Sequence, residues 1–471
     1  MTLTPAELVE SSYKFPFKLH DYQRAVINET AEMQRCAHFL DIGVGKTCTS
    51  SALALYKGLK GEVDQIVVIV PPILTVQWSN WLQGLGLDVT VYVGTLAQRK
   101  KMDMGADAIV LTYGILKNDF KALTERFKDT KLMIIVDECA AIRNPGSQTY
   151  KAVRDLTLLK DKHVCLLSGT PINKPWHCYG SIKIKTPEIY RSWTQFQAVH
   201  ITGVDQFDQP NAYANLGLLA ENLMLNAVRI RAEDVLELPE ITYQPVIYEL
   251  SNKHYKMYTK LIEKKLLELD DGKVIDGATR QRMYHAAQRA ILMPAEYGGG
   301  KIDPEGFKLI ENTAQETGMF SGVVAKLTIF CNYQESNEAI YQHTLGVKGL
   351  NPIQAYGKIG ATKNLANIDR FLNDPGINVL IAHPGSVAIG INLQSVCATA
   401  LFLELPLTSD TFQQALGRFY RQGQKRKCLI KFGIAAGTVQ VELGKRIVEK
   451  EADLQRILPT KQTLRAALTG R

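Results

Sequence analysis

Apolar runs with the length of a β-strand recur along the first half of the chain, and each ends in a polar or Gly/Pro cluster. They occupy residues 65–72, 107–114, 131–138 and 163–170. Continuous Val, Ile and Leu runs are typical of strands that helices cover on both faces, so this pattern predicts a parallel sheet. Ligands of open α/β sheets bind beyond the carboxyl ends of the strands, so the polar clusters are the first candidate site residues.

A second series of apolar runs predicts a second doubly wound domain. These runs occupy residues 326–332, 351–357, 378–385, 398–406 and 427–434. The predicted fold class is therefore α/β with two tandem parallel-sheet domains, 1–235 and 236–471. Stretches at about 174–230 and about 250–300, the second largely helical and basic, are predicted insertions that project from the two sheets.

Composition narrows the class of protein. Of the 471 residues, 46% are hydrophobic and 22% are charged, which is typical of a soluble globular protein and excludes extensive disorder. The net charge of +8 permits a polyanionic partner without requiring one. The eight cysteines form no CxxC pair, so neither a zinc module nor a disulfide framework is indicated. With no signal-like start and no long apolar stretch, we expect a cytoplasmic protein, in the host cytoplasm if it is viral.

The segment "FLDIGVGKTCTS", residues 39–50, is the first candidate site. Gly43 and Gly45 would let backbone N–H groups point at phosphates, the Lys46 ammonium would reach the β and γ oxygens, and the Thr47 hydroxyl would hold Mg²⁺. The common phosphate-loop pattern starts with a glycine six positions before the lysine, where this chain has Leu40. A glycine turn before an ordinary helix is the alternative interpretation.

Two adjacent acids, Asp137 and Glu138, follow the apolar run "LMIIV". Asp137 could hold magnesium through water, and Glu138 could take a proton from the water that attacks a phosphoryl group. The alternative is a solvated strand end, which is less plausible because the pair follows a phosphate loop.

Two arginines in "QQALGRFYRQGQ", residues 413–424, could complete such a site. Arg418 and Arg421 are three residues apart and would share one face if the segment is helical. Directed at a γ-phosphate, they would stabilise the charge of the transition state as an arginine finger does. Considered alone, the segment is better explained as a basic surface helix.

Taken together, these motifs resemble those of superfamily 2 helicases and, more narrowly, of the Snf2-like DNA translocases, from about residue 16 to about residue 450. "DIGVGKT" is similar to the family's phosphate loop, which also lacks the first glycine, and "VDECAAIRNPGSQTYKAV" is similar to its Asp-Glu-x-His motif. The Gln-Ala-x-x-Arg-x-x-Arg-x-Gly-Gln core at 414–424 is the most specific match. Further matches are "KLHDYQRAVI", "VIVPPILTVQWSNWL", "VLTYGIL", "LLSGTPINKPWHCYGSI", "LMLNAVRIRAEDVLELPE" and "AIGINLQ".

The resemblance implies two RecA-like domains that use ATP and Mg²⁺, with catalytic roles for Lys46, Asp137, Glu138, Arg418 and Arg421 and metal binding by Thr47 and Asp137. The nucleotide-binding residues that it implies are Gln23 at the base, Gly43, Val44, Gly45, Lys46, Thr47, Cys48, Gly390 and Gln414. Candidate contacts to a nucleic-acid backbone are Pro71, Thr75, Thr112, Tyr113, Asn144, Ser147 and Asn392. Phosphate contacts of this kind position a protein without reading sequence.

The sequence departs from the family pattern at two places. Cys139 and Ala140 replace the usual Ala-His after the acidic pair, and Val387 and Ala388 stand where two glycines are common. We expect these changes to alter the coupling of hydrolysis to movement more than ATP binding, so that Ala140→His would change the ratio of ATP used to DNA translocated.

Several other residues have no assigned role. Trp78 and Trp81 could lie in a helix core or contact DNA. The predicted insertions contain Arg191, Trp193, Lys253, Lys256 and Lys260. Exposed charged faces of this kind have the same sequence pattern whether or not they touch DNA.

The leading hypothesis is an ATP-dependent DNA translocase or helicase that remodels, unwinds or anneals DNA, favoured as a monomer on duplex or forked DNA without sequence specificity. Three alternatives stay open: the motor subunit of a restriction or nuclease system, a DNA-binding module with a degenerate ATPase, and an ATPase unrelated to nucleic acid. A partner nuclease or a replication or repair protein is possible, and no membrane is expected. The short length favours a phage or bacterial protein over a chromatin remodeller.

Overall fold

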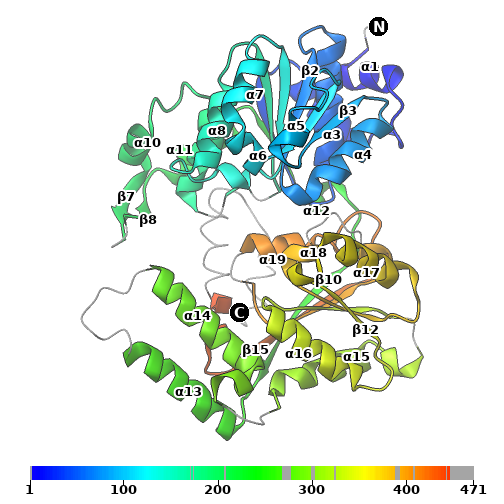
Figure 1. Ribbon diagram of the computed structural model, residues 1–471, viewed down its shortest axis with the longest axis vertical. Coiled ribbons are helices and arrows are strands. Elements are labelled where there is room, and N and C mark those ends of the chain that lie inside the picture. Colours follow the sequence, from blue (N-terminus) through cyan, green and yellow to red (C-terminus); the bar gives the residue numbers. More distant parts are fainter. Residues whose placement is uncertain are drawn as a thin grey trace. The chain divides into compact units, whose positions relative to one another are not determined.

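The computed structural model describes residues 3–169, 171–172, 174–205, 208–267, 277–298, 303–322, 325–387, 393–406, 409–441 and 443–445. The chain divides into two compact units, here called unit 1, which extends to Glu237, and unit 2, which starts at Leu238 (Figure 1). Each unit is built on its own parallel sheet.

Unit 1 contains a seven-stranded sheet in the order β3-β4-β2-β5-β6-β1-β9, and all its neighbouring strands are parallel. The four apolar runs predicted as strands form β2, β4, β5 and β6. The strands are β1 (Arg35–Leu40), β2 (Gln65–Val70), β3 (Val89–Tyr92), β4 (Ala108–Thr112), β5 (Leu132–Val136), β6 (Lys162–Leu167) and β9 (Ala227–Ile230).

Helices cover both faces of this sheet, because alternate strand residues point to opposite sides. Ile134 and Val136 of β5 pack towards α6, α7, α8 and α9, whereas Met133 and Ile135 pack towards α3 and α4. The helices are α1 (Pro5–Ser12), α2 (Asp21–Thr30), α3 (Lys46–Leu59), α4 (Thr75–Gly84), α5 (Leu96–Arg99), α6 (Tyr113–Asn118), α7 (Phe120–Phe127), α8 (Gln148–Thr157), α9 (Cys178–Lys185), α10 (Trp193–His200), α11 (Leu216–Met224) and α12 (Ala232–Val235).

The stretch at about 174–230 differs from the predicted projecting insertion. Cys178, Tyr179 and Ile182 of α9 are buried in the core of unit 1, and β9 is the edge strand of the main sheet. The helices α10 and α11 also contribute to this core, through Phe196, Leu219 and Leu223, whereas β7 (Ile201–Val204) and β8 (Pro210–Tyr213) form a separate antiparallel pair. The apolar residues of α9 were hard to recognise in the sequence, because Gly180, Lys183 and Lys185 interrupt them and Lys174 precedes the helix.

Unit 2 contains a six-stranded sheet in the order β10-β15-β14-β11-β13-β12, again with parallel neighbours throughout. All five runs of the second series are strands of this sheet, which confirms the predicted fold class of two parallel-sheet domains. The strands are β10 (Ile241–Tyr248), β11 (Leu327–Phe330), β12 (Pro352–Ala355), β13 (Val379–Ala382), β14 (Thr399–Phe402) and β15 (Cys428–Ala435).

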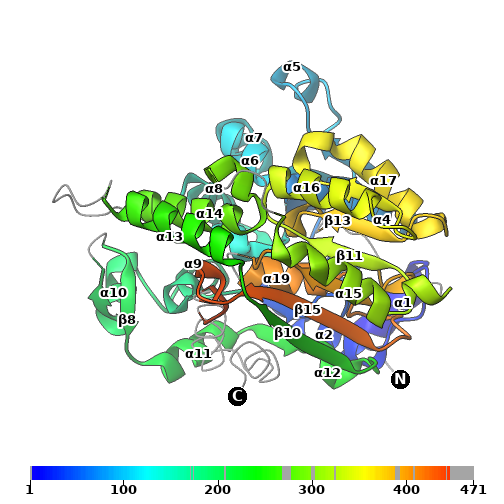
Figure 2. The same ribbon diagram turned by 90° about the horizontal axis from the view of Figure 1, so that it is seen from below.

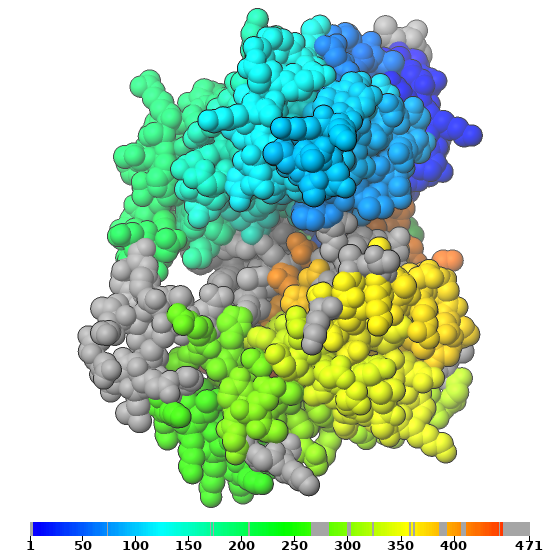
Figure 3. All heavy atoms as spheres, in the orientation of Figure 1, coloured from blue at the N-terminus to red at the C-terminus, as the bar shows by residue number. Residues whose placement is uncertain are grey.

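The sheet of unit 2 is also covered on both faces. One face packs against α15 (Lys308–Glu316) and α16 (Gln334–Leu345), and the other packs against α17 (Ala361–Asn373) and α19 (Ser409–Leu416). In Figure 3 the yellow segments that include α16 and α17 form much of the visible face of unit 2. A short helix, α18 (Pro384–Val387), follows β13.

A helical hairpin extends from unit 2. It consists of α13 (Asn252–Leu267) and α14 (Gly277–Leu292), which lie side by side in Figures 1 and 2. Of the helices in the described ranges, none combines the length and apolar character of a membrane span.

Candidate active site

The phosphate-loop segment connects β1 to α3. Gly43 and Gly45 have φ angles of 88° and 98°, in the left-handed region that favours glycine. A Cβ at Gly45 would also lie 2.3 Å from Nε2 of Gln23, so a side chain here would be strained by its φ angle and would displace the Gln23 amide from the loop. Because α3 starts at Lys46, the loop leads directly into the N-terminus of a 14-residue helix, where free N–H groups favour anions.

Two predicted residues contact this loop from within unit 1. Gln23 is buried, and its Nε2 donates to the Val44 carbonyl at 3.3 Å. The Lys46 ammonium donates to the Leu40 carbonyl at 3.1 Å, at the end of β1. The Thr47 side chain is half-buried, whereas that of Cys48 is buried among α1, α2 and α3. Gln23 and Lys46 are thus both beside the loop, as the sequence predicts, while binding of a base by Gln23 stays a prediction.

Asp137 follows β5 and is buried, with 5% of its surface exposed. Its Oδ2 accepts a hydrogen bond from Trp78 Nε1 at 2.7 Å, and its Oδ1 accepts one from the Glu138 amide at 2.9 Å. Burial raises the pKa of the Asp137 carboxyl, and the Trp78 hydrogen bond and the charge of Lys46 oppose this rise. Trp78 therefore both packs in the core and fixes the orientation of the carboxylate.

Glu138 has a strained backbone, with φ of 50° and ψ of 57°, at the start of the 3₁₀ turn Cys139–Ile142. Non-glycine residues held in this region are found mainly where the surrounding structure fixes them, often at functional sites. The Tyr113 hydroxyl lies 2.5 Å from the Asp137 carbonyl and 3.3 Å from the Glu138 carbonyl. Tyr113 thus positions the backbone of the acidic pair, a role that no sequence pattern indicated.

An ion pair between Arg229 and Asp41 fixes the start of the phosphate loop, just after β1. Arg229 on β9 contacts Asp41 at 2.7 Å, and it also donates to the carbonyls of Phe39 and Gly169. The second Asp41 oxygen accepts from the Ala232 amide at 3.0 Å. Arg229 belongs to the arginine-containing segment "AVRIRAED" that resembles a family motif, but only the pairing of β9 with β1 brings it to the loop.

His38 holds the helices beneath the loop together. Its Nδ1 lies 3.1 Å from the Thr49 hydroxyl on α3, and its Nε2 lies 3.1 Å from the Thr30 hydroxyl on α2. Cys36 and Cys165 lie close enough to His38 to form a metal-ligand group by distance alone. Since both ring nitrogens already contact hydroxyls, we interpret this group as a buried polar link.

The candidate nucleic-acid contacts of unit 1 have diverse environments. Thr75 and Thr112 are buried, and their hydroxyls contact the Pro72 carbonyl and the Ile115 amide. Asn144 is exposed, and the Ser147 hydroxyl caps α8 by accepting from the Tyr150 amide. Pro71 is half-buried just beyond β2. DNA contact by these residues and by Tyr113 stays a prediction.

In unit 2, Arg418 and Arg421 lie beyond the end of α19, which ends at Leu416. The expected shared helical face is therefore wrong, because the chain turns after Leu416 and both Phe419 and Tyr420 donate to its carbonyl. Burial lowers the pKa of Arg421, and its Nε has no hydrogen-bond partner in the described part of the chain. We call residues 417–424 the arginine segment; Gln414 precedes it, half-buried on α19.

Gln424 fixes the end of the arginine segment. It is buried, and its Nε2 donates to the carbonyls of Phe419 and Cys397 at 3.2 and 3.1 Å. Its Oε1 accepts from the Arg426 amide at 3.0 Å. The Gln424 side chain thus links the arginine segment to the main chain just before β14. The predicted residues Gly390 and Asn392 lie outside the described residues, as does Ala388.

Comparison with known proteins decides the family. The model of the SNF2-related domain matches residues 27–290, which is more than half of the chain. The chain belongs to the SNF2-related family. This confirms the resemblance that the sequence motifs indicated.

Curated relatives of this SNF2-related chain are longer proteins. It is 22% identical to a "DNA repair and recombination protein RAD54-like" of Drosophila grimshawi, over 91% of this chain and 61% of that protein. It is 24% identical to "DNA repair protein rhp54" of Schizosaccharomyces pombe, over 90% and 56%. It is 23% identical to the "TATA-binding protein-associated factor mot1" of Aspergillus fumigatus, over 90% and 26%. The chain thus spans less than two thirds of each relative.

Among solved structures, the SNF2-related chain is similar to the "Sulfolobus solfataricus SWI2/SNF2 ATPase core in complex with dsDNA". The two are 20% identical, with a TM-score of 0.45 and coverage of 96% of this chain and 95% of that one.

Proposed function

We propose that this chain is an ATP-dependent DNA translocase that hydrolyses ATP with residues of both units and moves along DNA without reading its sequence. The observation that carries the proposal is the construction of the acidic pair. Trp78 orients the buried Asp137 carboxylate, and Tyr113 holds the strained backbone of Glu138. Such an arrangement costs stability and is expected to persist where chemistry needs it.

The residues of unit 1 fit a nucleotide with Mg²⁺. The Thr47 hydroxyl and the Asp137 carboxylate are hard oxygen donors of the kind that Mg²⁺ prefers. Each Asp137 oxygen accepts one hydrogen bond, which leaves lone pairs for a metal-bound water. Bound Mg²⁺ would neutralise charge on the phosphate oxygens.

Each remaining residue has a separate task. The N–H groups of the glycine loop and the Lys46 ammonium would bind the phosphates. Glu138 would accept a proton from the attacking water. Arg418 and Arg421 of unit 2 would stabilise the negative charge of the transition state, so that hydrolysis requires both units.

DNA as the partner is inferred from family membership and from the names of relatives that act in DNA repair and recombination. The half-buried Ser147 is the N-cap of α8, and the exposed Asn144 lies three residues before it, near a helix N-terminus where phosphate contacts are favourable. We expect duplex or forked DNA to be preferred.

The experiment is steady-state ATP hydrolysis by the wild type and Lys46→Ala with no nucleic acid, single-stranded DNA, duplex DNA, forked DNA and RNA. We expect strong stimulation by duplex or forked DNA that falls with added salt and is absent in Lys46→Ala. Equal rates with and without every nucleic acid would contradict the proposal and favour an ATPase unrelated to nucleic acid.

A further inference from the structure

The outer face of α13 has a row of four lysines. Lys253, Lys256, Lys260 and Lys264 are all exposed, and their spacing of three and four residues places them on one side of the helix. Within the described residues none of these lysines has an ion-pair partner, although Glu263 is exposed nearby. Over about 16 Å of helix, this row presents unpaired positive charge of the kind that phosphates attract.

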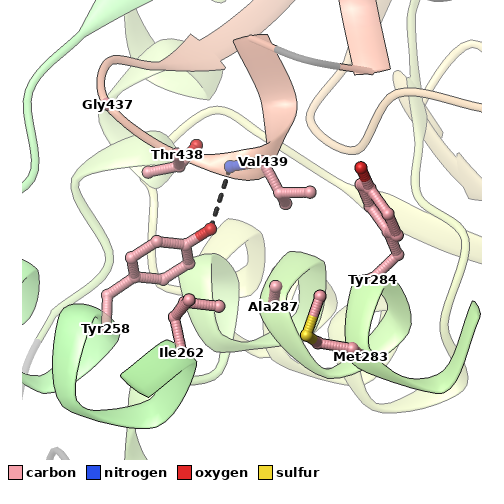
Figure 4. A pocket seen from close by; sticks show the side chains of 8 residues that line it. All are labelled: Tyr258, Ile262, Met283, Tyr284, Ala287, Gly437, Thr438 and Val439. Carbon is pink, nitrogen blue, oxygen red and sulfur yellow. Dashed lines mark hydrogen bonds between the residues drawn. The ribbon is translucent and has the colours of Figure 1, made fainter. Parts of the chain in front are cut away.

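The opposite side of the hairpin is attached to unit 2. Tyr258 and Ala287 pack with Leu250, Ile291 and Ala435 in one buried apolar cluster. The Tyr258 hydroxyl accepts a hydrogen bond from the Val439 amide at 2.9 Å (Figure 4). The side of α13 opposite the lysine row is therefore packed against unit 2 near the end of β15.

Beside this attachment lies a pocket of about 250 Å³ between the two helices and the loop after β15. In Figure 4 the side chains of Ile262 and Met283 lie along its helical side, and Thr438 and Val439 lie opposite them. The pocket is open to solvent on one side, so only part of the hairpin's inner face contacts this loop.

Gln288 of α14 connects the hairpin to the segment between β14 and α19. It is fully buried, and its Nε2 donates to the Leu405 carbonyl at 2.8 Å. Its Oε1 accepts from the Tyr333 hydroxyl at 3.0 Å, and that hydroxyl also contacts His285 Nδ1 at 2.8 Å. The Leu405 carbonyl accepts a second hydrogen bond from Asn332 at 2.8 Å. Burial makes each of these contacts costly to leave unsatisfied.

Leu405 lies three residues beyond β14, and α19 starts four residues later at Ser409. The arginine segment follows α19 directly, and its far end is attached by Gln424 to the Cys397 carbonyl just before the same strand. A shift of α14 that moves Gln288 would therefore act on the chain that leads to Arg418 and Arg421.

From these contacts we propose that the α13 lysine row binds the phosphates of duplex DNA and that Gln288 transmits this contact to the arginine segment. The inference rests on the proposed function and adds a surface and a positioning residue to it. The hairpin is then the element of unit 2 that makes hydrolysis respond to DNA.

The first test compares the triple variant Lys253→Gln, Lys256→Gln and Lys260→Gln with a control that removes the same charge elsewhere on unit 2. The control is Lys308→Gln, Lys348→Gln and Lys363→Gln, three exposed lysines outside the hairpin. Duplex affinity is measured over a range of salt concentrations. We expect the slope of log K against log salt to fall by about two to three for the hairpin variant, since each lost phosphate contact removes about 0.9. The control variant should show the same slope as the wild type.

The second test removes the link itself with Gln288→Leu, which has a similar volume and neither donor nor acceptor. The control is Asn364→Leu, a buried amide on α17 that bridges the amide and carbonyl of Tyr356. We expect Gln288→Leu to lower the DNA-stimulated kcat about tenfold while the KM for ATP and the duplex affinity stay within twofold of the wild type. Asn364→Leu should keep full stimulation even if it melts at a lower temperature.

The outcomes separate the inference from the proposed function. If no nucleic acid stimulates the wild type, the proposed function fails. If the wild type is stimulated but the hairpin lysine variant matches its control, or Gln288→Leu keeps full stimulation, the inference is overturned and the proposed function stands.

Discussion

Glu138 combines a strained backbone with a side chain suited to accept a proton. Replacing it by Gln keeps the shape and removes the base, so we expect Glu138→Gln to lower kcat at least 100-fold, in the range usual for general-base catalysis. The Tyr113 contact involves main-chain carbonyls and should persist in this variant. Nucleotide affinity, measured by calorimetry, should stay within a few-fold of the wild type. A loss of nucleotide binding equal to the loss of rate would contradict this role.

Gly45 offers a test of the loop geometry with a matched control. Gly45 and Gly86 have φ angles of 98° and 88°, but a Cβ at Gly86 meets nothing within 4 Å. Each substitution by Ala should cost about 1 kcal/mol of stability, because L side chains are strained at such angles. Only Gly45→Ala should also weaken ATP binding, since its Cβ would displace the Gln23 amide from the phosphate loop. Thermal melting and nucleotide titration of both variants decide this, and equal ATP affinity in the two would refute this effect.

At the scale of residues, the sequence indicated the candidate phosphate-binding and acidic residues. It did not indicate the side chains that position them. Gly45, Lys46 and the acidic pair are detectable because phosphate chemistry fixes their types and spacing. Arg229 reaches the loop only through the pairing of β1 with β9, in which Ala37 lies opposite Ala227, 190 residues further along the chain. No local pattern could therefore place it. Trp78, considered for either core or DNA, lies in the core, and its indole also contacts Asp137.

The connection between β14, β11 and α16 contains a buried carboxyl whose ionisation should be measurable. Glu404 is fully buried and accepts hydrogen bonds from the Asn332 amide and the Ser336 hydroxyl, both at 2.6 Å. Burial raises the pKa of this carboxyl from 4.5 to about 7, against the effect of these hydrogen bonds and the charge of Arg289. The folded protein thus holds this proton over a pH range in which the unfolded chain has released it.

The sign of the pH effect follows from this difference. A carboxyl whose pKa is raised by folding contributes stability at low pH and loses that contribution as pH rises through its folded pKa. For Glu404 the loss should be about 2 to 3 kcal/mol between pH 5 and pH 8. Glu404→Gln cannot ionise, so its stability relative to the wild type should improve by that amount over the same range. Denaturant unfolding of both proteins at several pH values tests this, and a constant difference would show that Glu404 does not titrate there.

At the scale of elements, most strands were predictable, including the edge strand β12, whereas the inner strand β1 and the edge strands β3, β9 and β10 were not. The runs that form β2, β5, β11 and β14 contain at most one polar residue each, because helices cover both of their faces. The edge strands β3, β9 and β10 are short or only half-buried, so polar residues interrupt them and weaken the pattern. The turn after α19 was also unpredictable, since helical spacing of Arg418 and Arg421 continues in the sequence beyond the point where the helix ends.

At the scale of the whole molecule, the proposed function requires that a residue of unit 2 acts on ATP bound by Lys46 of unit 1. Arg421 allows a sharp test, because burial lowers its pKa and its Nε has no partner among the described residues. Burying a charge without compensation destabilises a fold, so removing this one should not lower stability. We therefore expect Arg421→Ala to melt at or above the wild-type temperature and to bind nucleotide normally, yet to lose roughly 1000-fold in kcat, as removal of an arginine finger does.

The control for this prediction is Arg426→Ala, which removes the same charge from an exposed position five residues further on. It should keep both kcat and melting temperature, because an exposed cation is well solvated and stabilises little. If Arg421→Ala instead lowers the melting temperature and leaves the rate per folded molecule unchanged, Arg421 is a structural residue of unit 2. Loss of rate with full stability would mean that unit 2 retains a poorly compensated charge because the reaction needs it, as the proposed function requires.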